Sequence, residues 1–361
     1  ERDSLSSGVD SDPADSDPAD SDPGVEGPRM VQLEGVEDAW RAIVADLDGD
    51  GLEEIGLAVY DEGRGGAHLY EELEGGRLGA ELQELPVSPE WVNTSRGFEV
   101  LEGMREQGAV IAVSEHVGTG LVYLLEDPWT EGQQYSRGVD NDYLGWDMGS
   151  AEDLDGDGLR DLALLSLSDG FVVRGTLGAG AGLLRVKDVG ARDLESDSDL
   201  DGDGLDDLVM SGHVFLAGVG GVIEAEDADI VLEGVTGQVE LDDLDGDGHV
   251  DLLGADGLGE VLRYAEPLSG EVVGQLDLGE AGGVAYMGQV VRPFGDGAPW
   301  VPLRTTAPAA LVPAEFEGAL LLEDVAYDLG VVATDFRPLD ADGAEDLLIC
   351  GGECWVFDAD P

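Results

Sequence analysis

The chain has 361 residues, of which 81 are Asp or Glu and 17 are Lys or Arg, giving a net charge of −64. A field of this sign repels nucleic acids and anionic lipid surfaces, so we expect neither nucleic-acid binding nor membrane insertion. An apolar fraction of 42% is ample for a core and excludes a wholly disordered acidic protein.

Residues 1–27 form a low-complexity tail in which Asp-Ser-Asp-Pro occurs three times. Proline every five residues opposes helix and sheet, and the charge opposes collapse, so this segment is predicted to be extended and solvated. Two roles stay open for it: a linker that holds the folded part away from a surface, or an arm that docks in another copy. The chain begins at Glu1 without a hydrophobic signal, so we expect a secreted or cell-surface protein whose signal peptide has been removed.

The rest of the chain, residues 28–361, carries four copies of a nonapeptide with the pattern D-x-D-x-D-G-x-x-[DE]. Four carboxylates within nine residues repel one another, so the folded loop requires a cation. Ca²⁺ suits such a loop because it takes about six to eight oxygen ligands and tolerates irregular geometry. Positions 1, 3 and 5 would supply carboxylates, the glycine at position 6 permits the turn, and the position 7 carbonyl and position 9 carboxylate would complete the shell. The copies are residues 46–54, 153–161, 199–207 and 243–251.

The residues after each copy decide between kinds of calcium loop. An EF-hand, a dockerin or a thrombospondin type 3 repeat needs an acidic position 12. Each copy is followed instead by a short run rich in leucine and β-branched residues, which is typical of a strand. The alternative, that the Asp-Gly pairs only make hairpin turns, does not account for four copies with one carboxylate spacing. Position 12 is occupied by Leu57, Leu164, Met210 and Gly254.

The spacing of the copies predicts the architecture. The fifth positions of the last three copies are 46 and 44 residues apart, and the gap of 107 before them has room for two units. Degenerate copies at 103–113, 292–297 and 338–346 extend the series to seven units of about 45–54 residues, a period typical of a β-propeller. Each unit supports four short strands. In the first unit they are expected at 39–46, 54–60, 67–73 and 79–85.

The last unit is one strand short, and a spare strand is expected before the first loop, at 30–35. We therefore predict an all-β fold, a seven-bladed β-propeller with four-stranded antiparallel blades. The N-terminal strand would complete the seventh blade and close the ring, which removes unpaired sheet edges. No stretch shows a convincing amphipathic helical period.

The loop, its place between strands and the sevenfold count resemble the FG-GAP/VCBS-type repeats of integrin α-subunit propellers and of related bacterial secreted proteins. The resemblance covers residues 28–361 and implies about four structural Ca²⁺ ions at the blade hairpins. The residues at position 7 would contribute only their backbone carbonyls. By position, the implied ligands are Asp46, Asp48, Asp50, Leu52 and Glu54; Asp153, Asp155, Asp157, Leu159 and Asp161; Asp199, Asp201, Asp203, Leu205 and Asp207; and Asp243, Asp245, Asp247, His249 and Asp251.

Two loops depart from the pattern. Glu54 replaces aspartate at position 9 and calls for a slightly wider loop. The copy at 338–346 has proline at position 1 and keeps Asp340, Asp342 and Asp346, so we expect only weak metal binding there.

The only two cysteines, Cys350 and Cys354, flank a predicted hairpin of the seventh unit. A zinc site would lack partner ligands, which leaves a small hairpin disulfide, the favoured interpretation, or two buried thiols. Calcium loops with dissociation constants of about 10⁻⁴–10⁻³ M suit the extracellular space. At ten times the dissociation constant each site would add about 1.4 kcal/mol to the free energy of unfolding, so the metal is expected to be structural.

The sequence offers no catalytic constellation. His68, His116, His213 and His249 are scattered, and no G-x-S-x-G, P-loop or H-E-x-x-H motif occurs, so we expect no enzyme. The favoured function is a non-enzymatic extracellular calcium-binding scaffold or adhesion protein that binds a protein or a glycan on a propeller face. It would self-assemble as a homo-oligomer or filament through its N-terminal tail or strand. A carbohydrate-binding propeller module is the alternative, and a polysaccharide-acting enzyme is the third.

Overall fold

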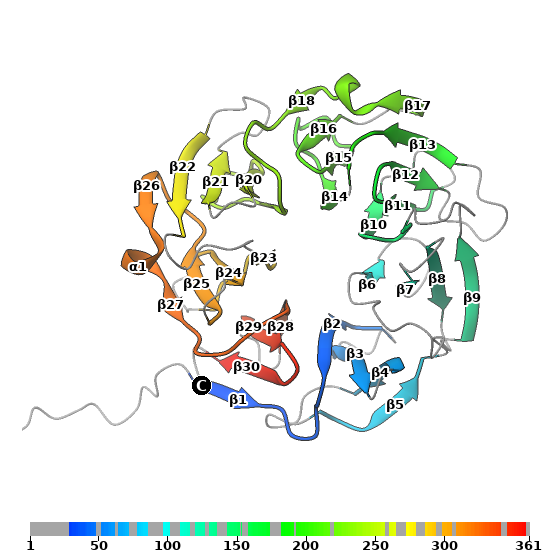
Figure 1. The fold of residues 1–361 in the computed structure, drawn as a ribbon, viewed down its shortest axis with the longest axis vertical. Coiled ribbons are helices and arrows are strands. Elements are labelled where there is room, and N and C mark those ends of the chain that lie inside the picture. The colour runs from blue at the N-terminus through cyan, green and yellow to red at the C-terminus, as the bar shows by residue number, and fades with distance from the viewer. Residues whose placement is uncertain are drawn as a thin grey trace, which may run out of the picture.

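The computed structural model arranges seven small β-sheets in a ring, as the blades of a propeller (Figure 1). The predicted fold class is confirmed. The predicted tail lies outside the described residues, as does most of the degenerate copy at 103–113. The structure describes residues 29–47, 52–61, 64–71, 78–85, 97–101, 109–115, 120–126, 130–135, 143–151, 153, 158–173, 182–190, 193–216, 220–256, 260–264, 272–278, 286–293, 298–304, 308–340 and 345–358.

Within each blade the strands follow one another from the centre outward. Blade 1 contains β2 (Ala39–Ala45), β3 (Glu54–Asp61), β4 (Arg64–Tyr70) and β5 (Glu81–Glu84). Blade 2 contains β6 (Phe98–Leu101), β7 (Val110–Glu115), β8 (Leu121–Glu126) and β9 (Thr130–Tyr135). Blade 3 contains β10 (Met148–Ala151), β11 (Asp161–Leu165), β12 (Gly170–Val173) and β13 (Gly182–Lys187). Blade 4 contains β14 (Leu194–Ser198), β15 (Asp207–Met210), β16 (His213–Phe215) and β18 (Ile230–Val231).

The remaining three blades repeat this plan. Blade 5 contains β19 (Val239–Asp242), β20 (Asp251–Ala255), β21 (Glu260–Tyr264) and β22 (Val272–Asp277). Blade 6 contains β23 (Tyr286–Met287), β24 (Trp300–Arg304), β25 (Ala310–Pro313) and β27 (Tyr327–Asp328). Blade 7 contains β28 (Asp335–Asp340), β29 (Glu345–Cys350), β30 (Cys354–Asp358) and β1 (Arg29–Gln32).

The N-terminal strand closes the ring, as predicted. β1 pairs antiparallel with β30, so the first strand of the described chain supplies the outer strand of the last blade. The blade 7 hairpin also bonds to blade 1, because Ala39 and Gly352 exchange two backbone hydrogen bonds of 3.0 and 2.8 Å. The structure joins Cys350 and Cys354 in a disulfide across this same hairpin.

Two blades are larger than predicted. β17 (Gly221–Glu224) adds to blade 3 beside β13, and β26 (Gly318–Leu321) adds to blade 5 beside β22, both in parallel orientation. Each extra strand belongs to the chain of the following blade, between its third and fourth strands. The prediction of four antiparallel strands in every blade is therefore wrong for blades 3 and 5. These connections are long enough to reach back and cover the outer edge of the preceding blade (Figure 1).

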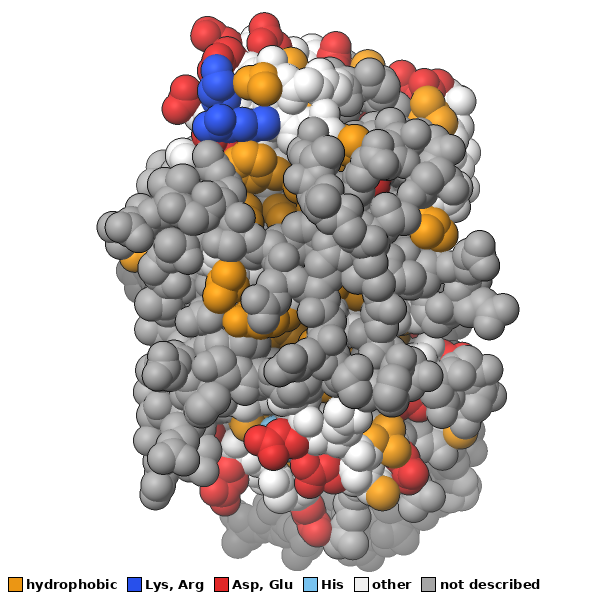
Figure 2. All heavy atoms as spheres, turned by 90° about the vertical axis from the view of Figure 1, so that its right-hand side faces the viewer, with side chains coloured by type: hydrophobic (Ala, Val, Ile, Leu, Met, Phe, Trp, Pro, Cys, Tyr) orange, Lys and Arg blue, Asp and Glu red, His pale blue; other side chains and the backbone are white. Residues whose placement is uncertain are grey.

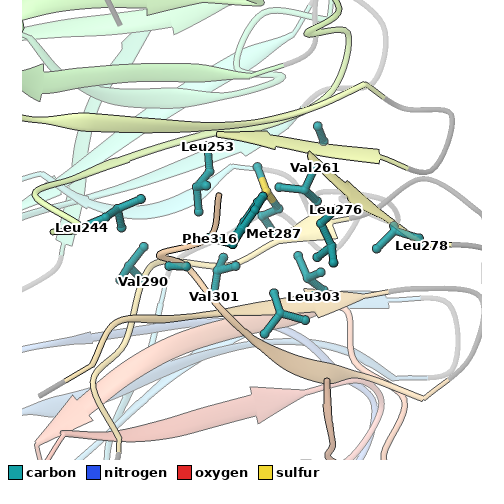
Figure 3. Packing of buried hydrophobic residues seen from close by; sticks show 13 residues of the cluster. Leu244, Leu253, Val261, Leu276, Leu278, Met287, Val290, Val301, Leu303 and Phe316 are labelled. Carbon is teal, nitrogen blue, oxygen red and sulfur yellow. The ribbon is translucent and has the colours of Figure 1, made fainter. Parts of the chain in front are cut away.

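The core lies between the blades. Among the described residues, seven buried apolar clusters occur, and each combines side chains of two consecutive blades. Figure 3 shows the cluster between blades 5 and 6, where Leu253 and Leu276 approach Val301 and Leu303. Neighbours pack against both faces of each sheet, so second strands such as β11 are buried at every position. This packing accounts for their continuous apolar sequence.

Helix is nearly absent from the described part of the chain. It contains one turn of α-helix, α1 (Leu322–Val325), and one of 3₁₀-helix, η1 (Ala225–Asp227). Neither could cross a bilayer.

Candidate metal centre in the blade loops

The acidic nonapeptides occupy one structural position in their blades. Each connects the innermost strand to the second strand, as in the loop from β14 to β15 and the loop from β19 to β20. Position 9 is the first residue of the second strand in all four complete copies. The four loops therefore join equivalent strands at the same end of their blades.

The third loop, residues 199–207, is described throughout. Both carboxylate oxygens of Asp199 accept backbone hydrogen bonds, from Gly202 N at 2.7 Å and Gly204 N at 2.8 Å. Asp201 accepts from Asp203 N at 3.0 Å, and Asp203 accepts from Leu205 N at 2.9 Å. These bonds wrap the chain into successive turns. Ligand oxygens of Asp199, Asp201 and Asp207 all lie within 4.8 Å of one another.

The fourth loop, residues 243–251, repeats this network. Asp243 accepts from Asp247 N at 3.0 Å and Gly248 N at 2.9 Å, and Asp247 accepts from His249 N at 2.9 Å. Carboxylates of Asp243, Asp245 and Asp247 gather within 4.8 Å. The two fully described loops thus bring together six of the eight predicted carboxylates, while Asp203 and Asp251 lie outside the two groups.

Arg263 of β21 explains the orientation of Asp251. Its buried guanidinium lies 3.2 Å from Asp251 and 3.5 Å from Asp245. Burial raises the pKa of Asp251, and the hydrogen bond and charge of Arg263 oppose that rise. The sequence analysis did not predict this arginine. It lies twelve positions after the last acid of the nonapeptide, and the local sequence does not show that the two side chains meet.

The first, second and degenerate loops are described in part. Asp153 accepts from Gly158 N at 2.7 Å, the same bond that position 1 makes in the third and fourth loops. Outside the described residues lie Asp48, Asp50, Asp155, Asp157 and Asp342. Of the predicted side-chain ligands in these loops, the structure describes Asp46, Glu54, Asp153, Asp161 and Asp346, and of Asp340 it describes only the backbone.

In the first and third loops, the position 9 carboxylate accepts a hydrogen bond from the backbone N–H of the leucine at position 2. Glu54 accepts from Leu47 N at 2.7 Å, and Asp207 accepts from Leu200 N at 2.8 Å. Leu47 and Leu244 are each only 4% exposed and belong to inter-blade clusters. Figure 3 shows Leu244 beside Val290 at one end of its cluster. In these loops the leucine and the position 9 acid therefore attach the loop to the blade, in addition to the oxygens that the acid offers.

Arginines link neighbouring loops. Arg160, at position 8 of the second loop, pairs with Asp206, at position 8 of the third. Arg292 of blade 6 bonds to Asp242 at 2.8 Å and to the carbonyl of Asp243 at 3.3 Å. These arginines offset the charge of the loops locally.

Figure 2 shows one side of the ring. Acidic side chains lie at both of its ends, and basic side chains lie near the top, at the height of β13.

The residues present fit a hard divalent cation. The two fully described loops each offer three clustered carboxylates, and an oxygen that accepts one backbone hydrogen bond keeps a second lone pair. The backbone bonds hold the carboxylates in place before any ion binds. Asp–oxygen ligands without nitrogen or sulfur favour Ca²⁺ or Mg²⁺ over zinc or copper.

No protein-family model matches the sequence, and no curated protein matches it. Solved structures do match the fold. The WD40 domain of coronin from Toxoplasma gondii has a TM-score of 0.54 at 11% sequence identity, with 94% of this chain and 88% of that one covered. This likeness extends over nearly the whole ring and establishes the protein as a seven-bladed β-propeller.

Proposed function

We propose that this protein is a non-enzymatic, calcium-stabilised binding scaffold that works outside the cell. The observation that carries the proposal is the geometry shared by the third and fourth loops. Two separate segments each draw three carboxylates within 4.8 Å around the same network of backbone hydrogen bonds. Such a cluster is costly without a cation, because like charges at this separation repel.

Calcium would act on the blades through the strands that the loops connect. Asp199 directly follows strand β14, and Asp207 is the first residue of strand β15. An ion bridging them would hold the β14–β15 hairpin closed. In the fourth loop the clustered carboxylates are Asp243, Asp245 and Asp247, so an ion there would hold the turn between β19 and β20. Four such ions would offset eight negative charges out of the net −64. The ion supplies charge neutralisation and crosslinking, and no chemistry of bond making is assigned to it.

An extracellular setting is consistent with the Cys350–Cys354 disulfide and with weak calcium loops. A rigid ring presents two faces to which partners can bind. Propellers host many functions, so the side chains on the binding face determine the partner, and the fold does not. We propose a protein partner, with assembly of copies of this chain through the N-terminal tail or strand. A glycan is the alternative partner.

Calorimetric titration of Ca²⁺ into chelator-treated protein tests the metal sites. We expect about four bound ions, with dissociation constants of about 10⁻⁴–10⁻³ M, and weaker binding of Mg²⁺. A variant with the position 3 aspartates changed to asparagine should lose this binding but keep the propeller fold at high salt. The changes are Asp48→Asn, Asp155→Asn, Asp201→Asn and Asp245→Asn. Equal heats for the variant and the wild type would contradict the proposed sites.

Electron microscopy of the protein in millimolar Ca²⁺, with and without chelator, tests assembly. Calcium-dependent oligomers or filaments are expected. Monomers alone under both conditions would contradict self-assembly and leave the metal sites unaffected. Binding on a glycan array would instead favour the carbohydrate-binding alternative.

A further inference from the structure

Several blades are linked to the next blade by a hydrogen bond. In each case a side chain at the start of the innermost strand accepts it from a backbone N–H of the next blade. Gln238 Oε1 accepts a hydrogen bond of 2.7 Å from Met287 N, which joins blade 5 to blade 6. Asp335 Oδ2 accepts one of 2.8 Å from Ala42 N, which joins blade 7 to blade 1. The first acceptor is a neutral amide. The second is a buried carboxylate whose charge is balanced by Arg41 at 3.0 Å.

Blades 3, 4 and 5 are linked in the same way by two carboxyl groups. Asp147 Oδ2 accepts from Leu194 N at 3.1 Å, joining blade 3 to blade 4. Asp193 Oδ2 accepts from Val239 N at 2.5 Å, joining blade 4 to blade 5. The two side chains are also hydrogen-bonded to each other. A hydrogen bond between two carboxyl groups requires a proton on one of them, because ionised carboxylates are acceptors only.

Charges of both signs lie near this pair. Asp147 faces the negative charge of Glu99 and the positive charge of Arg41, and Asp193 faces Glu240. Arg41 is already bonded to Asp335, and Glu99 is bonded to both terminal nitrogens of Arg337, at 2.9 and 2.7 Å. Arg41 and Arg337 therefore each bind a carboxylate outside the pair, Asp335 and Glu99 respectively.

Both carboxyl groups hold their protons more tightly than in water. Burial, followed by the charge of Glu99, raises the pKa of Asp147 to about 6. Burial, followed by the charge of Asp147, raises the pKa of Asp193 well above its ordinary value. Neither group belongs to the acidic loops, which lie at the other end of the same inner strands.

We propose that Asp147 and Asp193 form a proton-sensitive latch that holds blades 3, 4 and 5 together while the pair is protonated and loosens them when the proton is lost. The shared proton allows one carboxyl to donate to the other while both accept backbone N–H groups of the next blade. Its loss places two negative charges side by side, on the buried Asp193 and the partly buried Asp147, where they repel.

The direction of the pH dependence follows from linkage. The folded-state pKa values are raised above the unfolded value of about 3.9, so the folded state binds more protons. The contribution of the pair to stability is complete below the unfolded pKa. It is lost as pH rises through the folded pKa values, beginning near about 6 for Asp147. Calcium ligands must be deprotonated and so have the opposite dependence.

The test compares denaturant unfolding of the wild type and Asp193→Asn between about pH 5 and pH 8, in millimolar CaCl₂ and again in chelator. Asparagine can accept from Val239 N and donate to Asp147, so it mimics the protonated state. The measured quantity is the unfolding equilibrium constant of the wild type divided by that of the variant. As pH increases, this ratio should rise by up to about tenfold per pH unit for each proton that the folded wild type binds in excess of the unfolded chain. For the control Glu226→Gln, which neutralises an exposed acid, the same ratio should not change with pH. The ratio for Asp193→Asn should rise in both media, whether or not calcium binds.

Parallel pH profiles for the wild type and Asp193→Asn would overturn the latch. Should the variant fail to fold, infrared spectroscopy of the wild type decides. The folded protein at neutral pH should show the carbonyl band of a protonated carboxylic acid that disappears on unfolding. Its absence would equally refute the proposal.

Discussion

The aspartate at position 1 organises the second, third and fourth acidic loops. Asp153, Asp199 and Asp243 all accept a hydrogen bond from the glycine five positions later, at 2.7–2.9 Å. That glycine has a positive φ of 88–91° in these loops, a conformation that a side chain would strain. The loop is therefore shaped by its backbone. Three carboxylates are left clustered in each fully described loop, at positions 1, 3 and 9 of the third and at positions 1, 3 and 5 of the fourth. Their mutual repulsion is what a divalent ion would relieve.

Asp201→Asn should remove one calcium site. The bound ions should fall by one, and the calcium-dependent gain in unfolding free energy should fall by about 1.4 kcal/mol at ten times the dissociation constant. Titration calorimetry with denaturant unfolding measures both. Leu205→Ala is the matched control in the same loop, because position 7 would contribute only its carbonyl. If the two variants bind calcium alike, the assignment of ligands is wrong.

At the residue scale, the loop acids could be predicted and their arginine partners could not. The nonapeptide repeats its carboxylate spacing within nine residues, so local sequence suffices. The contacts of Arg160, Arg263 and Arg292 depend on which strands pair and how neighbouring blades face each other. The carboxyl latch was missed for the same reason. The sequence did contain a sign of it: Asp147 and Asp193 each lie six residues before the first aspartate of an acidic loop.

At the scale of elements, ring closure depends on β1 and the hairpin of blade 7. Leu33, directly after β1, is buried in the cluster between blades 7 and 1, and its N–H donates to the carbonyl of Cys354 at 2.9 Å. The need for such a strand was predictable from the short last unit. The fifth strands β17 and β26 could not be predicted, because a strand that pairs only at the outer edge of a sheet has no characteristic alternation of apolar residues in its sequence.

Leu33→Ala should weaken ring closure. Loss of a buried leucine side chain and the cavity left behind should lower the free energy of unfolding by about 2–5 kcal/mol. Denaturant unfolding measures the loss. Leu82→Ala on β5 removes the same atoms from a side chain that is 50% exposed, and it should change stability little. Similar losses for the two variants would show that β1 does not secure the ring.

Gly351→Ala should also disturb closure, by a different route. A Cβ there would lie 2.1 Å from the carbonyl oxygen of Val332, a backbone atom that cannot rotate away. Overpacking of this kind should cost about 1–3 kcal/mol, measured by thermal or denaturant unfolding. Gly220→Ala is the control, because its nearest neighbour would be at 3.7 Å. An unchanged stability for Gly351→Ala would mean that the hairpin shifts freely.

At the scale of the whole molecule, a net charge of −64 opposes compaction of the ring. In chelator, raising NaCl from about 0.01 M to about 0.5 M shortens the Debye length from about 30 Å to about 4 Å. The melting temperature should therefore rise with salt, and rise less when calcium is bound. Differential scanning calorimetry measures both series. A melting temperature that falls with salt would indicate that attractive charge pairs dominate.

The central claim is that divalent ions in the acidic loops stabilise this propeller. Thermal unfolding in millimolar Ca²⁺, compared with unfolding in EDTA at equal ionic strength, tests it most directly. Four sites at ten times their dissociation constant add about 5–6 kcal/mol, which for a ring of this size raises the melting temperature by roughly 8 °C. A melting temperature that is the same in both solutions would contradict the claim.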